Sequence, residues 1–87
     1  MCYSIEFSKE ASDDIDVIYT SDRRLFNRIF KKIESLEEKP YEGKPLVGNH
    51  KGEFSLRVGS YRIVYEIDPG KHVLYILTIK HRKHAYK

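Results

Sequence analysis

The chain has little cysteine and no long apolar segment. Among its 87 residues Cys2 is the only cysteine, so an internal disulfide and a cysteine-based metal site are both excluded. No apolar run approaches the roughly 20 residues that cross a bilayer. Residues 1–7 lack the charged and long apolar parts of a signal peptide. We therefore expect a soluble, cytoplasmic protein with no membrane partner.

Common catalytic and cofactor motifs are also absent. The sequence has no glycine-rich phosphate loop and no serine-nucleophile motif. Its histidines match no known metal-site spacing, and neither a cysteine nor an acid completes a ligand set around them: His50, His72, His81 and His84. The sequence thus predicts no metal and no cofactor.

Charge is unevenly distributed along a chain whose formal net charge is +3. Residues 1–20 are acidic, with Lys9 as their only base, whereas residues 79–87 hold four bases and no acid. A basic segment attracts polyanions, although four charges also suit an ordinary solubilising tail. The length predicts one small domain over residues 1–87, and 40% hydrophobic residues support a folded chain.

Hydrophobic periodicity predicts the order β-α-α-β-β-β. Alternation indicates a strand over residues 3–7, and helical spacing with Ser8 as N-cap indicates a helix over 9–20. Ser21 or Asp22 can cap a second helix, which carries a broad apolar stripe. Glycine and proline mark 39–52 as a loop. Strands are predicted over 53–58, 60–68 and 72–79, the last apolar on both faces and so central. The expected fold class is α+β, with a mainly antiparallel sheet and a two-helix hairpin on one face.

Two arginines stand out in the run that joins two of these strands. Because side chains alternate along a strand, Arg57 and Arg62 fall on the face opposite the apolar residues, close to the turn at Gly59. Two guanidiniums on neighbouring strands suit a phosphate or a carboxylate. The alternative is that both are solvated or pair with Glu53 and Glu66.

The chain resembles the RelE/ParE superfamily of bacterial and archaeal toxins over essentially its whole length. The resemblance rests on Phe7-Ser8-Lys9-Glu10-Ala11, on Leu36 followed by Pro40, and on Leu46-x-Gly48. It rests most on Arg57-x-Gly59-x-Tyr61-Arg62-x-x-Tyr65 combined with the closing His81-Arg82-x-x-x-Tyr86. It implies a RelE-like toxin that cuts messenger RNA in the ribosomal A site through attack of a 2′-hydroxyl on the adjacent phosphate. It also implies a RelB-like antitoxin that wraps the domain, with a heterotetramer as one possible assembly.

The resemblance also assigns roles to residues. Arg62 matches the catalytic arginine that stabilises the phosphorane, and Tyr86 matches the C-terminal tyrosine that orients or protonates in several members. His81 stands where some members use a histidine, a side chain type that can serve as either acid or base. The remaining predicted contacts to RNA phosphates come from Arg57, Lys51, Lys80 and Arg82. For His81 and Tyr86 the alternatives are a satisfied histidine at a strand end and a tyrosine packed over the sheet edge.

One departure from the RelE pattern leaves other functions open. The best-known members carry two lysines on the strand before the Arg-x-Gly turn, where this chain has Glu53 and Ser55. Lys51 or His50, just upstream, are candidate substitutes. The departure favours a second hypothesis, a ParE-like toxin that poisons DNA gyrase by binding alone. A third is a basic RNA-binding module without catalysis.

Overall fold

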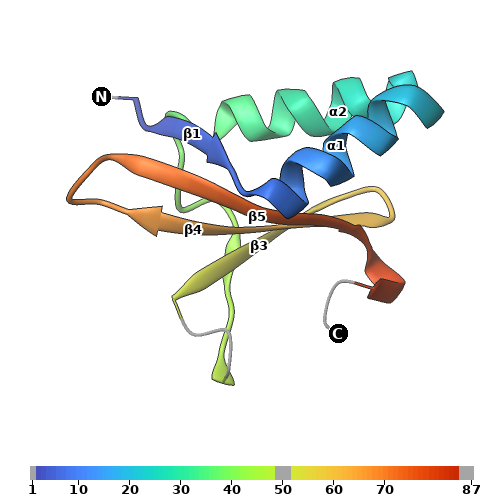
Figure 1. The fold of residues 1–87 in the computed structure, drawn as a ribbon. Helices are drawn as coiled ribbons and strands as arrows, with labels where there is room; N and C mark the ends of the chain where they lie inside the picture. The colour runs from blue at the N-terminus through green and yellow to red at the C-terminus, as the bar shows by residue number, and fades with distance from the viewer. Residues whose placement is uncertain (1, 49–51, 85–87) are drawn as a thin grey trace.

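The chain folds into a helical hairpin lying on one face of a five-stranded sheet (Figure 1). The computed structural model describes residues 2–48 and 52–84. The elements in chain order are β1 (Ser4–Phe7), α1 (Lys9–Ser21), α2 (Arg23–Ser35), β2 (Lys44–Pro45), β3 (Glu53–Val58), β4 (Tyr61–Asp68), β5 (Val73–His81) and the short 3-10 helix η2 (Arg82–His84). The predicted fold class is confirmed.

Side-chain caps set where both helices begin. The Ser8 hydroxyl accepts a hydrogen bond from the Ala11 N–H at 3.0 Å, as predicted for the N-cap of α1. Of the two candidate caps for α2, Asp22 takes this role by accepting from the Leu25 N–H at 3.1 Å. The chain thus turns between the helices within one residue, which forces α1 and α2 into a tight antiparallel hairpin.

The strands lie in the order β1-β5-β4-β3-β2. β1 pairs with β5 in parallel, and the other pairs are antiparallel, so β5 is an interior strand as its apolar sequence predicts. One prediction for the segment 39–52 is wrong: this loop contains the short edge strand β2, which pairs with Phe54 and Ser55. Two residues, one of them Pro45, carry no periodicity, and proline is tolerated at a sheet edge.

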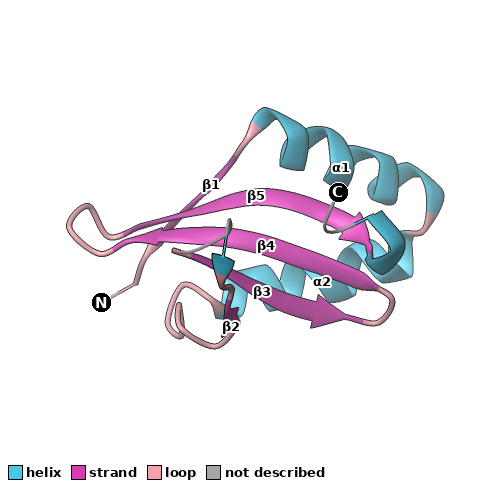
Figure 2. Cartoon of the chain, turned by 90° about the horizontal axis from the view of Figure 1, so that it is seen from below, coloured by secondary structure: helices cyan, strands magenta, loops and turns pink. Residues whose placement is uncertain are grey.

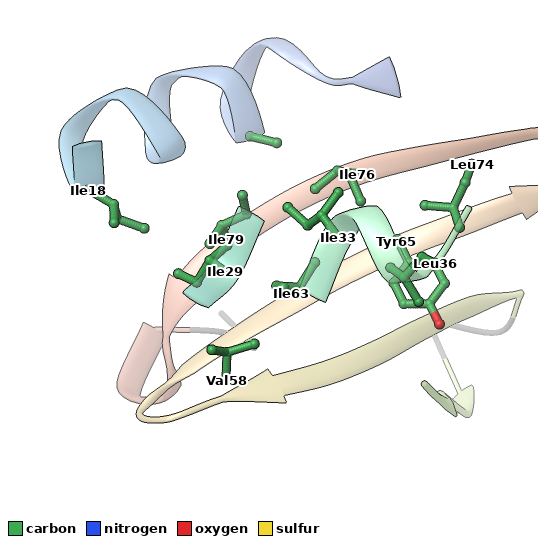
Figure 3. Close-up of a cluster of buried hydrophobic side chains, with 11 residues drawn as sticks. Ile18, Ile29, Ile33, Leu36, Val58, Ile63, Tyr65, Leu74, Ile76 and Ile79 are labelled. Carbon is green, nitrogen blue, oxygen red and sulfur yellow. The ribbon is translucent and has the colours of Figure 1, made fainter. Parts of the chain in front are cut away.

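The hydrophobic core lies between the hairpin and the sheet (Figure 3). α2 contributes isoleucines at helical spacing, and β4 and β5 contribute residues that alternate with the solvent-facing ones. The core residues are Ala11, Ile18, Ile29, Ile33, Leu36, Val58, Ile63, Tyr65, Leu74, Ile76 and Ile79. Side chains alternate along a strand, and those of β3 and β4 that join the core face the helices. The polar residues of these strands therefore lie on the opposite face of the sheet.

Figure 2 views the sheet from this second face, with α2 behind the strands and α1 beyond the edge of β5. β3, β4 and β5 lie side by side across this view, and β2 lies beside β3. Among the described residues no helix is long and apolar enough to cross a membrane. The face that the helices leave uncovered carries the side chains considered next.

Candidate phosphate-binding site

A row of basic residues crosses the sheet on the face away from the helices. Arg57 of β3 is directly paired with Arg62 of β4, and Arg62 is paired with Lys80 of β5. Directly paired residues point to the same face, and their neighbours Ile63 and Ile79 point into the core. The predicted placement of Arg57 and Arg62 opposite the apolar face is therefore confirmed.

The two arginines differ in exposure. Arg57 is exposed, whereas Arg62 is half-buried and its Nε atom has no accessible surface. The tight β3–β4 turn begins at Gly59, whose φ of 60° lies in the region that favours glycine. This turn holds the ends of both strands, and hence the backbone of both arginines, in a fixed relation.

A pocket of about 380 Å³ lies beside this pair. Besides Arg57 and Arg62, its lining comes from Ser55 and Leu56 of β3 and from the segment around β2, namely Glu42, Gly43 and Lys44. The carboxylate of Glu42 binds the Lys32 ammonium at 2.9 Å, and this bond lowers the Glu42 pKa. The acid at the pocket rim is thus ionised and already has a cationic partner.

Sequence reasoning missed Lys44 as a candidate functional residue. β2 pairs Lys44 directly with Ser55, which lies two residues before Arg57 on the same face of β3. Ser55 occupies one of the two positions where a lysine was expected from the resemblance. No local pattern in the sequence indicates that Lys44 lies beside Ser55. The two residues are 11 positions apart, and β2 is too short to show a periodicity.

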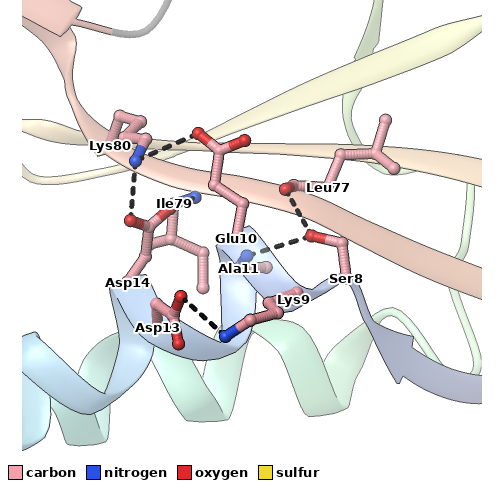
Figure 4. A network of polar contacts seen from close by, with 9 residues as sticks. All are labelled: Ser8, Lys9, Glu10, Ala11, Asp13, Asp14, Leu77, Ile79 and Lys80. Atoms are coloured by element: carbon pink, nitrogen blue, oxygen red, sulfur yellow. Dashed lines mark hydrogen bonds and ion pairs between the residues drawn. The ribbon is translucent and has the colours of Figure 1, made fainter.

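Lys80 is held by acids of α1 and not by the arginines. Its ammonium lies 2.7 Å from an Asp14 oxygen and 3.1 Å from a Glu10 oxygen (Figure 4). The hydrogen bond to Asp14 is the main cause that raises the Lys80 pKa, with Glu10 adding to it. The same Asp14 carboxylate accepts the Ile79 N–H at 3.0 Å. Lys80 is thus paired with Arg62 in the sheet, but its ammonium forms ion pairs with acids of α1.

His81 belongs to the opposite face from Arg62. It is paired with Tyr61, and the two rings contact edge to face at a centroid distance of 5.5 Å. The His81 Nδ1 accepts a long hydrogen bond from the Lys83 N–H at 3.3 Å. The structure therefore does not bring the imidazole onto the face of the arginine pair, and it places the ring as a packed histidine at a strand end.

The remaining predicted residues lie near the end of β5 or outside the described ranges. Arg82 begins η2, is exposed, and its backbone N–H donates to the Ser60 carbonyl of the β3–β4 turn at 2.8 Å. This bond ties η2 to the turn beside the arginine pair. Lys51 and Tyr86 lie outside the described residues, as does His50.

A larger groove of about 800 Å³ runs between α2 and the end of β3. Arg57 lines it as well, with bases and acids of α2 and the following segment: Arg28, Lys31, Lys32, Glu34, Glu38, Lys39 and Glu42. Acids alternate with bases here, so this groove presents a mixed surface. In the smaller pocket three of the four charged lining residues are cations, against five of eight in the larger groove, and we place the candidate site in the smaller pocket.

Known proteins resemble this chain in sequence over most or all of its length. The family model for the ParE toxin of the type II toxin–antitoxin system parDE matches residues 5–86. Toxin RelG of Mycobacterium tuberculosis is 32% identical over 88 residues, which cover 100% of this chain and 99% of the relative. Toxin RelE of the same organism is 44% identical over 45 residues, which cover 52% of this chain and 46% of the relative's length.

Solved structures give the same result for the fold. The crystal structure of the toxin–antitoxin complex RelBE2 from M. tuberculosis contains a chain with a TM-score of 0.82 and 30% identity, matched over 94% of this chain and 100% of that one. The YoeB/ParE toxin from Agrobacterium tumefaciens has a TM-score of 0.82 at 22% identity, over 90% and 96% of the two chains, and supports the fold alone. The chain therefore belongs to the ParE toxin family of type II toxin–antitoxin systems, within the RelE/ParE superfamily.

Proposed function

We propose that this toxin is a metal-independent endoribonuclease that cuts messenger RNA in the ribosomal A site. In this reaction the RNA 2′-hydroxyl attacks the adjacent phosphorus, the bond to the 5′-oxygen breaks, and a 2′,3′-cyclic phosphate forms. The reaction needs a base for the 2′-hydroxyl proton, cations for the extra negative charge, and an acid for the leaving 5′-oxygen. The cationic requirement is the one that the described residues meet.

The observation that carries this proposal is the direct pairing of Arg57 with Arg62. Like charges opposite each other on neighbouring strands destabilise a sheet, and a phosphate between them removes that repulsion. Half-burial of Arg62 lowers the dielectric around its guanidinium and strengthens its attraction to an anion. We assign Arg62 to the phosphorane and Arg57 to support of the same phosphate.

The other assignments follow the family resemblance. Tyr86 and His81 are the proposed proton-transfer groups, and Arg82 and Lys51 the proposed contacts to flanking phosphates. Since His81 packs on Tyr61 on the far face, Tyr86 is the preferred of the two for proton transfer. Lys80 reaches RNA only if it leaves its acids on α1, so we place it last among the phosphate contacts.

We also propose a RelB-like antitoxin that wraps this domain. An apolar groove of about 400 Å³ opens where β1 and the two helices meet, and it is lined by Phe7, Ser12, Ile15, Asp16, Tyr19, Phe26 and Phe30. Phe30 remains 40% exposed although its ring stacks on Phe26. Exposed aromatic residues of this kind suit an apolar face of a partner segment that orders on binding.

The test is cleavage of messenger RNA on programmed ribosomes, followed by primer extension. Arg62→Ala should lower the cleavage rate by about 10²–10³, the usual loss when a preorganised charge donor is removed. Arg24→Ala, which removes an exposed charge from α2, is the matched control and should cleave at the wild-type rate. Wild-type cleavage by a folded Arg62→Ala protein would remove Arg62 from the site.

Tyr86→Phe and His81→Gln in the same assay separate the two proton-transfer candidates. Loss of cleavage in one variant, with an unchanged melting temperature, assigns the role to that residue.

The alternative is a toxin that inhibits DNA gyrase by binding alone. The engagement of Lys80 by α1 and the presence of Ser55 where a lysine was expected favour it, because both reduce the catalytic cations. Wild-type protein that leaves messenger RNA intact on ribosomes but stops supercoiling by purified gyrase would establish this alternative in place of the nuclease.

A further inference from the structure

We propose that Lys44 is a phosphate-binding residue of the site, held there by a buried contact between the loop before β2 and Tyr65. The inference rests on the proposed function for its ligand, a phosphate of an RNA strand. Sequence reasoning placed Lys44 in a loop and gave it no role. Three observations connect it to the arginine pair.

The first observation is register. β2 pairs Lys44 with Ser55, and β3 pairs Ser55 with Val64 on β4. Arg57 and Arg62 form the next row on this face, two residues along each strand. Cross-strand neighbours on diagonal positions of one face lie within reach of long side chains. A lysine on β2 can therefore extend toward an anion held by the two arginines.

The second observation is the pocket. Lys44, Arg57 and Arg62 line one cavity of about 380 Å³, a volume that accommodates a phosphate group and part of a sugar. Ser55 lies on its floor and is only 9% exposed. A small side chain at Ser55 leaves open the space that a lysine at that position would fill. Lys44 then brings its ammonium from the neighbouring strand.

The third observation is the way in which the loop is fixed. The Tyr65 hydroxyl, which is fully buried, donates to the Pro40 carbonyl and accepts from the Gly43 N–H, both at 2.9 Å. A Cβ at Gly43 would lie 2.6 Å from the Tyr65 oxygen and 2.8 Å from the Ser55 carbonyl. Only glycine permits this approach, and it sets the residue that follows, Lys44, opposite Ser55.

Charges around the pocket agree with an anionic ligand. Glu42 is the acid in the lining, and its carboxylate is bound by Lys32 from α2 and lies within 3.5 Å of the Ser35 hydroxyl. Its negative charge is thus balanced outside the arginine pair. Lys44, Arg57 and Arg62 together attract a phosphate more strongly than the two arginines alone.

The test measures binding of inorganic phosphate by the purified toxin, followed through backbone amide shifts in NMR spectra. Phosphate should shift the amides of Ser55, Arg57 and Arg62 with a dissociation constant in the millimolar range, about 4 kcal/mol of binding. Lys44→Gln should weaken binding about three- to tenfold, and Lys44→Arg should restore most of it. Lys71→Gln, with the same charge change in the β4–β5 turn, is the matched control and should bind like wild type.

Equal affinities for Lys44→Gln and Lys71→Gln would overturn the assignment. A wild-type protein that binds no phosphate at 50 mM, roughly fifty times the expected constant, would overturn it as well. The proposed function is tested separately, by the assay of messenger RNA cleavage on programmed ribosomes. A wild-type protein that binds phosphate through Lys44 but cleaves no messenger RNA would refute the nuclease and leave the phosphate site standing.

Discussion

Tyr65→Phe should destabilise the fold strongly for the loss of a single oxygen atom. The hydroxyl is fully buried and bridges the Pro40 carbonyl and the Gly43 N–H. Its removal leaves a buried donor and a buried acceptor without this partner, at about 1–3 kcal/mol for each group. Allowing for partial rescue by water, we expect a loss of about 2–4 kcal/mol in the free energy of unfolding. For a domain of this size that is a fall of roughly 8–30 °C in melting temperature.

Urea unfolding followed by circular dichroism measures this loss. Tyr19→Phe is the matched control, because Tyr19 is 43% exposed and loses little when its oxygen is removed. A Tyr65→Phe protein within about 0.5 kcal/mol of that control would refute the reasoning, since it would show that the loop meets its hydrogen-bonding needs without the hydroxyl.

The difference in stability between wild type and Tyr65→Phe should depend on pH. Burial raises the pKa of Tyr65, and this effect exceeds the lowering caused by the hydrogen bond from Gly43. The folded pKa lies above the unfolded value near 10, so the stabilisation is fully present below about pH 10 and is lost as the pH rises through the folded pKa. Wild type should therefore lose stability more steeply than Tyr65→Phe above about pH 10. A constant gap between the two proteins from pH 8 to pH 11, roughly one unit past the ordinary value, would contradict this.

Two further predictions concern the hairpin. Asp14→Ala should lower the free energy of unfolding by about 1–3 kcal/mol, because the Ile79 N–H loses its acceptor and Lys80 loses its nearer partner. Thermal unfolding measures this loss, and a variant that unfolds like wild type would show that water replaces the carboxylate. Phe30→Glu should weaken binding of the proposed antitoxin at least tenfold by calorimetry and leave the melting temperature within a few degrees. Val47→Glu, at an exposed apolar residue away from the hairpin, should bind the antitoxin like wild type, and equal affinities of the two variants would place the partner elsewhere.

Local patterns were sufficient for the main elements of the fold. The predicted strand over 53–58 coincides with β3, and the other predicted strands and the first helix differ from the structure by one or two residues at their ends. The N-cap at Ser8 follows from a serine placed directly before a helical apolar pattern. Each of these features depends on residues within a few positions of one another, which is the range over which periodicity and capping act.

The pocket was beyond such reasoning because it depends on distant contacts. Lys44 reaches the arginine pair only through the pairing of β2 with β3, and that pairing depends on a tyrosine hydroxyl 22 residues away from Gly43. In the sequence Tyr65 belongs to an alternating strand and to the motif that carries the family resemblance, and neither feature indicates a contact with Pro40 or Gly43. Glycine at position 43 signals a loop, and the close approach that requires it is visible only in three dimensions.

The charge asymmetry of the sequence has a structural cause that changes how the basic end is interpreted. β1 pairs with β5 only as far as Ile76, so the edge of β5 beyond it is left without a strand. α1 covers this edge with side chains: the Ser8 hydroxyl donates to the Leu77 carbonyl at 2.7 Å, and Asp14 accepts from the Ile79 N–H.

Acids on α1 are therefore required beside β5, and Lys80 neutralises two of them, Glu10 and Asp14. The acidic start and the basic end of the chain compensate each other at this contact. A basic tail that interacts internally contributes less to attraction of a polyanion than its formal charge suggests. The cations best placed to bind a phosphate are thus Arg57, Arg62 and Lys44. They come from the middle of the chain and line one pocket together.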